Sequence, residues 1–334
     1  MWKALLFPEN TDIPVMQAML RTIAILVLFG ALQPAAVNGQ VLENFSADTP
    51  SWVLVQRGDQ LLREQQTAAA IELYNEALAR EGTLPEALIG LGTAYLGSGD
   101  DQLALRELQL ALDQEQFLYT PEDRYRILYL LADTFIIRGE QRKLQDTLLS
   151  IVDDDPYFSD PEHQDARRNY RRVLQQEGVD HLFRLYRLPE IFSRKAHREL
   201  GMQFLLQNLP SQAVDHLIFA MLMGFSEVIE EMRRIFPMYQ YSSVLQTYQD
   251  IFTDDPRTAH LREYLLHDSF TAELLYLADA FYIEGQQALA NALWRLVAEV
   301  PGPVQIQERA RRQLQEPTMP DTFIRRMIDE RLIK

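Results

Sequence analysis

The chain has 334 residues, 47% of them hydrophobic and 24% charged, which is typical of a folded protein and excludes disorder throughout. Its formal net charge of -16 repels phosphate backbones and therefore argues against nucleic acid as a partner. The absence of cysteine excludes disulfides, a thiolate nucleophile, Cys-ligated metals and the lipid-carrying cysteine of a bacterial lipoprotein.

Residues 1–39 have the pattern of a secretory signal peptide. The apolar run TIAILVLFGAL at 22–32 follows Arg21, and the small residues Val37 and Gly39 have the spacing of a cleavage site. The run is about half as long as the ~20 apolar residues that a membrane-spanning helix needs. The sequence therefore predicts an exported chain, which would be periplasmic in a bacterium.

The segment before this run fits a signal peptide poorly, because it contains prolines and acidic side chains. Met16 and Met19 are alternative starts that would give a conventional short basic segment. Cleavage after Gly39 would leave residues 40–50 as a flexible leader. An uncleaved N-terminus is the alternative, and it would anchor the chain as its only contact with the membrane.

Residues 51–118 contain two consecutive copies of one pattern. The copy at 51–84 matches the copy at 85–118 with a constant offset of 34 residues. Such a period is the length of two antiparallel helices joined by a short turn. The matching positions are Gly58 with Gly92, Leu61 with Tyr95, Ala70 with Ala104, and Ala77 with Ala111.

This pattern resembles the tetratricopeptide-repeat (TPR) family. The resemblance covers about residues 51–304 and implies an all-α fold, a right-handed α-solenoid of helix–turn–helix repeats. The glycine in the first helix and the early alanine in the second would let the two helices approach closely. The larger residues Tyr74 and Leu108 are expected to fill the space toward the next repeat.

Further copies of the pattern follow along the chain. Those at 125–158, 194–227 and 271–304 keep most of its small and large positions, whereas those at 159–192 and 225–258 keep fewer. The sequence therefore predicts seven units, two of them degenerate.

These copies divide the mature chain into three parts. Residues 51–158 are predicted to be regular TPR repeats, and residues 159–270 are predicted to be degenerate TPR-like helical repeats. Residues 271–334 are predicted to hold a last TPR and closing helices at 304–316 and 320–333. An irregular helical bundle is the alternative for the middle part, where the pattern is blurred.

The sequence lacks the motifs of nucleotide-binding loops, serine hydrolases, zinc proteases and EF-hands. None of its six histidines lies four residues from another, and His197 and Glu199 are on different faces of a helix. The acidic runs before Pro156 and Pro256 are predicted to be solvated loops. We therefore expect no catalytic residue, no cofactor and no metal, and we expect that the chain is not an enzyme.

In the TPR family the first helix of each unit lines a concave, partner-binding face. The resemblance implies that this face is apolar and acidic here, without the basic clamp that holds a C-terminal carboxylate in chaperone-binding members. Such a face suits an amphipathic helix or extended peptide with basic flanks. Alternatively, its acids, Asp279 among them, are ordinary solvated residues. The implied partner-binding residues are Trp52, Val55, Asp59, Leu62, Ile89, Tyr129, Asp133 and Ile136.

Three classes of function follow from these observations. The first is a non-enzymatic scaffold or assembly adaptor of the bacterial cell envelope, whose protein partners belong to outer-membrane assembly or a periplasmic flagellar structure. The second is a ligand-binding helical module that encloses a small apolar molecule. The third is an enzyme whose active site lies outside the motifs considered above.

Overall fold

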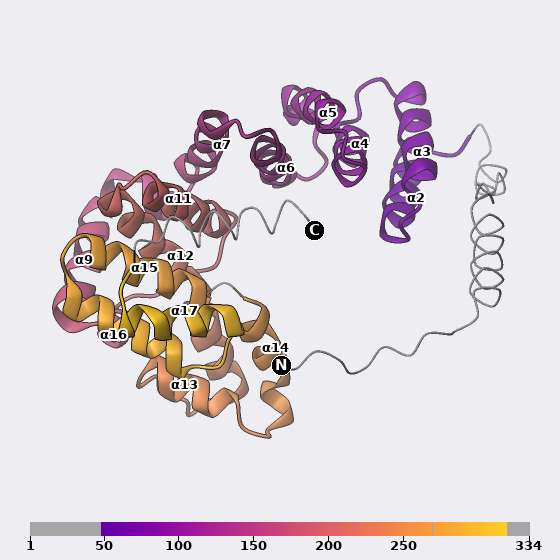
Figure 1. Cartoon of the computed structure of the whole chain (residues 1–334). Coiled ribbons are helices and arrows are strands. Elements are labelled where there is room, and N and C mark those ends of the chain that lie inside the picture. Colours follow the sequence, from indigo (N-terminus) through magenta and orange to yellow (C-terminus); the bar gives the residue numbers. More distant parts are fainter. Residues whose placement is uncertain (1–47, 269, 319–334) are drawn as a thin grey trace, which may run out of the picture. The chain divides into compact units, whose positions relative to one another are not determined.

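The computed structural model describes residues 48–268 and 270–318 (Figure 1). These residues form helices joined by turns, and no β-strand occurs among them. The predicted all-α class is therefore confirmed. The predicted signal peptide, most of the leader and the closing helix at 320–333 lie outside the described residues.

The chain divides into two compact units at the Arg80–Glu81 junction. The described part of the first unit is a single pair of helices, α2 (Ser51–Arg63) and α3 (Thr67–Arg80). The second unit begins with two more pairs in the same order. These are α4 (Pro85–Gly97) with α5 (Asp101–Asp113), and α6 (Asp123–Arg138) with α7 (Gln141–Asp153).

The remaining helices of the second unit are less regular in length. Short 3-10 turns occur at Glu115–Phe117, Pro161–His163 and Pro256–Thr258. The helices in chain order are α8 (Pro156–Ser159), α9 (Gln164–Glu177), α10 (Val179–Leu185), α11 (Arg194–Leu206), α12 (Pro210–Ile235), α13 (Val244–Ile251), α14 (Ala259–His267), α15 (Phe270–Ile283), α16 (Gln287–Glu299) and α17 (Val304–Gln315).

One contact recurs in three of the helix pairs. A Cβ atom added to Gly58 would lie 2.6 Å from the ring of Tyr74, and one added to Gly92 or Gly201 would lie 2.5 Å from the Cγ of a leucine. In each case the large side chain follows the glycine by 16 residues, as the pairs Gly58 with Tyr74, Gly92 with Leu108 and Gly201 with Leu217 show. The large side chains thus fill space within their own pair, against the glycine, and not only toward the next repeat as expected.

The alanines predicted at the close crossing, Ala70 and Ala104, are fully buried, as the crossing requires. Ala104 on α5 has no exposed surface, whereas Ala79 on α3 is exposed. Because overpacking a tight core costs about 1–3 kcal/mol, we expect Ala104→Leu to lower the free energy of unfolding by that amount. Ala79→Leu is the control and should change it little. Urea denaturation of both variants measures the difference, and equal effects would contradict the close crossing.

The structure departs from the predicted repeats in the middle of the chain. Helix α12 runs without a break from Pro210 to Ile235, so residues 225–235 extend the second helix of one pair instead of starting a new unit. Gly178, at φ 85°, separates the consecutive helices α9 and α10 within the weak copy at 159–192. The repeat period is therefore interrupted on both sides of α11.

Helix α12 is the centre of the second unit's core and packs against α11 and α15. Its Phe225 stacks on Phe270 with ring centroids 4.5 Å apart, and Phe183 and Tyr248 complete this aromatic cluster. Among the described helices, α12 is the one with the length and hydropathy of a membrane span, but 83% of its apolar window is buried inside the protein. Its apolar character is therefore accounted for by the core.

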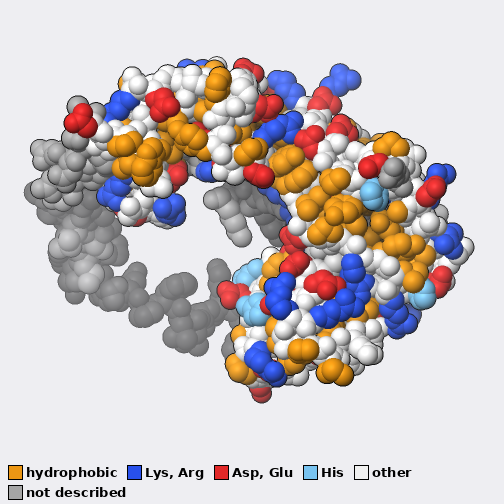
Figure 2. Space-filling model, turned by 180° about the vertical axis from the view of Figure 1, so that it is seen from behind, with side chains coloured by type: hydrophobic (Ala, Val, Ile, Leu, Met, Phe, Trp, Pro, Cys, Tyr) orange, Lys and Arg blue, Asp and Glu red, His pale blue; other side chains and the backbone are white. Residues whose placement is uncertain are grey.

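The surface drawn in Figure 2 carries both signs of charge. Basic and acidic side chains lie beside one another over much of the described part of this face, and hydrophobic side chains are scattered between them. The net charge of -16 is therefore not gathered there into one acidic patch.

Candidate functional site: an arginine-lined pocket and its buried support

The predicted partner-binding residues of α2 differ in exposure. Trp52 is 51% exposed, Leu62 is half-buried, and Val55 is buried. The half-buried Asp59 accepts a hydrogen bond of 2.7 Å from the hydroxyl of Tyr74. Of these residues, only Trp52 presents most of a large side chain to solvent.

The predicted residues of α4 and α6 are largely used inside the second unit. Ile89 is 1% exposed, so it lies in the core and not on an open face. The hydroxyl of Tyr129 donates to the carbonyl of Phe192 at 2.6 Å and accepts from the backbone N–H of Ala196 at 3.0 Å. The structure thus ties this part of α6 to the start of α11.

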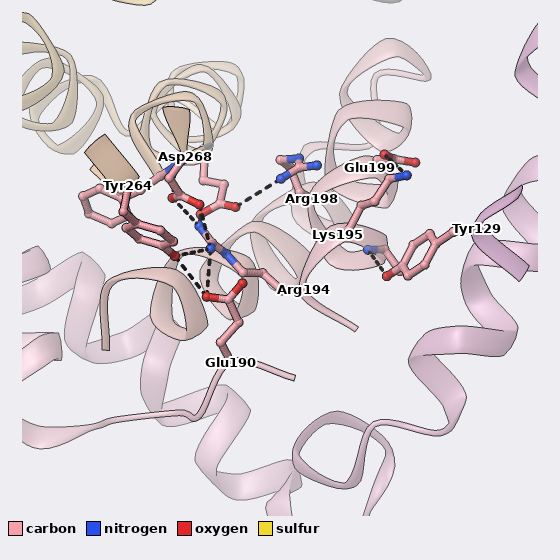
Figure 3. Close-up of polar contacts among 11 residues, drawn as sticks. Tyr129, Glu190, Arg194, Lys195, Arg198, Glu199, Tyr264 and Asp268 are labelled. Carbon is pink, nitrogen blue, oxygen red and sulfur yellow. Dashed lines mark hydrogen bonds and ion pairs between the residues drawn. The ribbon is translucent and has the colours of Figure 1, made fainter. Parts of the chain in front are cut away.

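Lys195, the second residue of α11, joins two of the predicted residues. Its Nζ atom lies 4.8 Å from the ring centroid of Tyr129 (Figure 3) and 3.6 Å from Asp133. Ile136, one turn further along α6, is half-buried. The face around Tyr129 and Asp133 therefore meets a basic side chain of the chain itself, which the sequence pattern did not indicate.

Arg194 is the centre of a buried ion network. Its side chain is 5% exposed, and its guanidinium lies 2.6 Å from Asp268 and 3.2 Å from the buried Glu273. It also donates to the hydroxyl of Tyr264 at 2.8 Å and lies 3.1 Å from Glu190 (Figure 3). Burial disfavours the charge, but the neighbouring carboxylates outweigh this effect and raise the pKa of Arg194. The network joins α11 to α14 and α15.

Two histidines that are far apart in sequence meet in the core. His197 on α11 and His216 on α12 approach to 2.9 Å between their Nδ1 atoms, and the Nε2 of His197 lies 3.1 Å from Asp155. A carboxylate only accepts hydrogen bonds, so the neutral His197 carries its proton on Nε2. Its Nδ1 then accepts, and the Nδ1–H of His216 donates. Burial lowers the pKa of both histidines, and that of His216 strongly.

The acidic run before Pro156 was predicted to be a solvated loop. This prediction is wrong for Asp155, which is buried. Its carboxylate accepts hydrogen bonds from the backbone N–H groups of Tyr157 and Phe158, at the start of α8, and from the hydroxyl of Ser193 at 2.7 Å. Burial opposes the charge, but the hydrogen bonds from His197 and Ser193 outweigh it and lower the pKa of Asp155. Asp153 and Asp154 are exposed, as predicted.

Asp279, which was expected on the concave face, is also buried. It accepts from the indole N–H of Trp294 at 2.9 Å and from the side-chain amide of Gln313 at 2.8 Å. Burial raises its pKa to about 6 against these hydrogen bonds and the nearby Arg309. Asp279 therefore connects α15, α16 and α17, and does not face a partner.

A pocket of about 370 Å³ lies between α9 and α12. Arg171 in its wall donates to Ser211 at 2.9 Å and to Asp215 at 3.3 Å, and it pairs with Glu284. The pocket is lined by Gln164, Arg167, Arg168, Arg171, Asp215, Ile218 and Phe219. Its volume is at the lower end of the range for ligand sites.

Arg167 differs from the other arginines of this pocket. Its guanidinium lies over the ring of Phe158 at 4.5 Å, and it makes no ion pair or hydrogen bond with any side chain that the structure describes. The sequence carries a signal for this site in the arginines of RRNYRR at 167–172, where partners four residues apart share a helix face. The contribution of α12 could not be read from that signal.

The chemistry of these clusters is that of ion pairing and hydrogen bonding. Within the part of the chain that the structure describes, no group of His, Asp and Glu side chains could hold a metal ion. The hydroxyl of Ser193 donates to Asp155 and not to a histidine, so these residues do not form the nucleophile–base arrangement of a hydrolase.

Comparison with known proteins gives two relatives at low identity, and no family model matches the chain. An uncharacterized protein of Treponema pallidum (strain Nichols) is 24% identical over 224 residues, which cover 66% of this chain and 59% of the relative. An uncharacterized protein of Borreliella burgdorferi is 22% identical over 250 residues, which cover 67% of this chain and 76% of the relative. The chain thus spans less than two thirds of the Treponema protein and is similar to proteins of these two bacteria.

Proposed function

We propose that the chain is a non-enzymatic protein-interaction scaffold or assembly adaptor of the bacterial cell envelope, built as an α-solenoid of TPR-like helix pairs. The observation that carries the proposal is the contact of a glycine with a large side chain 16 residues later, which recurs in three pairs. Repeated pairs of this kind stack into extended surfaces that bind polypeptides. The resemblance to TPR proteins supports the same interpretation.

The exposed face of α2 is the best candidate for a contact surface in the first unit. Four exposed residues follow one another at spacings of three or four positions and therefore share one helix face. They are Trp52, Gln56, Gln60 and Arg63. Tryptophan is enriched among residues that dominate binding energy. Asp59 and Asp133 are weaker candidates, because both already have partners within the chain.

The location in the envelope rests on the predicted signal peptide at residues 1–39. A scaffold exported in this way would serve an assembly outside the cytoplasm, such as outer-membrane assembly or a periplasmic flagellar structure. Both relatives come from bacteria, which is consistent with that setting.

Site-specific photocrosslinking tests the proposal. A photoreactive amino acid at Gln56, in the middle of the exposed α2 face, should give covalent adducts with a protein in the cell envelope. The same group at the exposed Gln109 of α5 is the control and should give no such adducts. We expect Trp52→Ala to reduce the Gln56 adducts about tenfold or more, since an interface anchor contributes roughly 2 kcal/mol.

Two outcomes would contradict the scaffold. Identical adducts from Gln56 and Gln109 would show unspecific contact. An absence of adducts, together with a small apolar molecule that copurifies with the chain, would favour the alternative of a ligand-binding helical module.

A further inference from the structure

We propose that the pocket between α9 and α12 binds a carboxylate side chain from an acidic segment of a partner polypeptide, with Arg167 as the residue that pairs with it. This inference rests on the proposed scaffold function and names the chemistry of one partner contact. The charged side chains of the pocket differ in how far partners within the chain already compensate them.

Two of the three arginines have partners within the chain. Arg171 is held by Ser211, Asp215 and Glu284. Arg168, on the rim, lies 2.8 Å from Asp165. These arginines shape the pocket, but much of their charge is compensated by the carboxylates beside them.

Arg167 is therefore the arginine of the pocket without a direct carboxylate partner, although its charge also acts on Asp215 across the pocket. It lines the pocket, and it has no ion pair or hydrogen-bond partner anywhere in the described ranges. An arginine presents its donors as a planar fork that matches a carboxylate through two parallel hydrogen bonds. The guanidinium of Arg167 therefore matches one singly charged group of a ligand, such as a carboxylate.

The contacts of Arg167 fix its position before a ligand arrives. Its guanidinium stacks on Phe158, and that ring in turn contacts Phe219 at 5.1 Å and His216 at 4.9 Å between centroids. Phe158 is also placed by the bond of its backbone N–H to the buried Asp155. A side chain that is held in place loses less entropy on binding, so the stack favours ion pairing in the pocket.

The acidic neighbours select against a doubly charged ligand. Asp215 is in the lining, and Glu284 is bonded to the same wall through Arg171. These two carboxylates repel any anion, but the repulsion is about twice as large for a phosphate dianion. One guanidinium also neutralises a single carboxylate, whereas it leaves one charge of a dianion unpaired. The floor of Ile218 and Phe219 suits an aliphatic residue next to the acid.

The exposure of the rim favours a polypeptide over a small molecule. The side chain of Arg168 is 77% exposed, so the pocket does not enclose its ligand. A group presented by a larger partner gains further contacts outside the pocket. On a chain with net charge -16, the four arginines at 167–172 also provide a local site that an acidic segment can approach.

Titration with a defined peptide tests the inference. The probe is an acetylated and amidated peptide with the core Leu-Glu-Leu-Glu-Leu, and its binding to the full chain is followed through the peptide's NMR signals at low salt. We expect Arg167→Gln to raise the Kd about tenfold, because a bidentate charged pair is lost. Arg172→Gln is the matched control, since Arg172 bonds only to Asn169 and Gln176 among the described side chains, and it should change the Kd less than twofold.

Each remaining outcome decides the matter. No binding, equal binding of a peptide with Gln in place of Glu, or equal effects of the two variants would overturn the inference. Displacement of the peptide by inorganic phosphate at matched ionic strength would show a phosphate site instead.

The variant Arg167→Lys keeps the charge without the planar fork. Its Kd for the peptide should lie between those of wild type and Arg167→Gln. A melting temperature equal to that of wild type confirms that each variant is folded. If the peptide titration fails but the photoreactive group at Gln56 still gives adducts, the pocket proposal is wrong and the scaffold proposal is not affected.

Discussion

Replacing Arg194 with methionine is expected to lower the free energy of unfolding by about 3–5 kcal/mol. The guanidinium lies between Asp268 and the fully buried Glu273. Its removal would take away the closest basic partner of Asp268 and would leave Glu273 with the longer contact of 3.9 Å to Arg198. Breaking a buried ion pair by removing one partner has an effect of this size, because an uncompensated charge remains in the core. Urea denaturation of Arg194→Met at pH 7 measures the loss.

Lys195→Met is the matched control for this experiment. Lys195 is the next residue of the same helix, its side chain is 37% exposed, and its contacts to Asp133 and Glu199 are 3.6 and 3.9 Å long. The pair with Asp133 is exposed on both sides, and such pairs contribute about 1 kcal/mol or less. The contact with the buried Glu199 is at the distance limit of an ion pair, so we expect a smaller loss than for Arg194→Met. Equal losses in the two variants would show that the Arg194 network is not the connection between α11 and α15 that its geometry indicates.

Lowering the pH from 7 to 5 is expected to destabilise the fold through the histidine pair. Burial lowers the pKa of His197 and His216 in the folded state, whereas unfolded histidines bind a proton near pH 6.5. The unfolded state therefore takes up more protons below about pH 6.5, and the free energy of unfolding falls from that pH downward. We expect the pair to contribute a loss of about 2–3 kcal/mol, at about 1.4 kcal/mol per proton and pH unit.

A variant isolates this contribution from the other titrating groups. Asp279, with a folded pKa of about 6, acts in the opposite direction, because its folded form gains a proton first as the pH falls from 6 toward 4. In His216→Gln this effect is unchanged, so the pH-dependent loss should be about 1–2 kcal/mol smaller than in wild type. Parallel stability curves of the two proteins between pH 7 and 5 would contradict the titration of His216.

The helix pairs were predictable because their packing is local in the sequence. Gly58 and Tyr74 belong to consecutive helices, so the alternation of small and large residues that joins them repeats within the 34-residue period. The same reasoning failed at Gly224. This glycine leaves space for the guanidinium of Arg194 inside a continuous helix, whereas the sequence pattern placed a boundary between units beside it.

The buried polar groups could not be predicted, because their partners are distant in the chain. Asp155 meets Ser193 38 positions later, and Arg194 meets Glu273 79 positions later. A sequence pattern does not distinguish an acid in a solvated turn from one that a later helix covers. The arginine pocket lies between these two cases. The arginines of its α9 side are close together in RRNYRR and could have been found from the sequence, whereas the residues that α12 contributes could not.

The length and apolar character of α12 have a consequence for how the chain is made. Its covering helix α15 begins 35 positions after α12 ends, since these helices end and begin at Ile235 and Phe270. The earlier helix α11 covers one side of α12, but until α15 has been synthesised the other side of this 26-residue helix, which has the hydropathy of a membrane span, lacks its cover. A chaperone that meets the nascent chain at this stage therefore encounters a half-covered segment that resembles a membrane anchor, and the arrival of α15 completes its burial in the core.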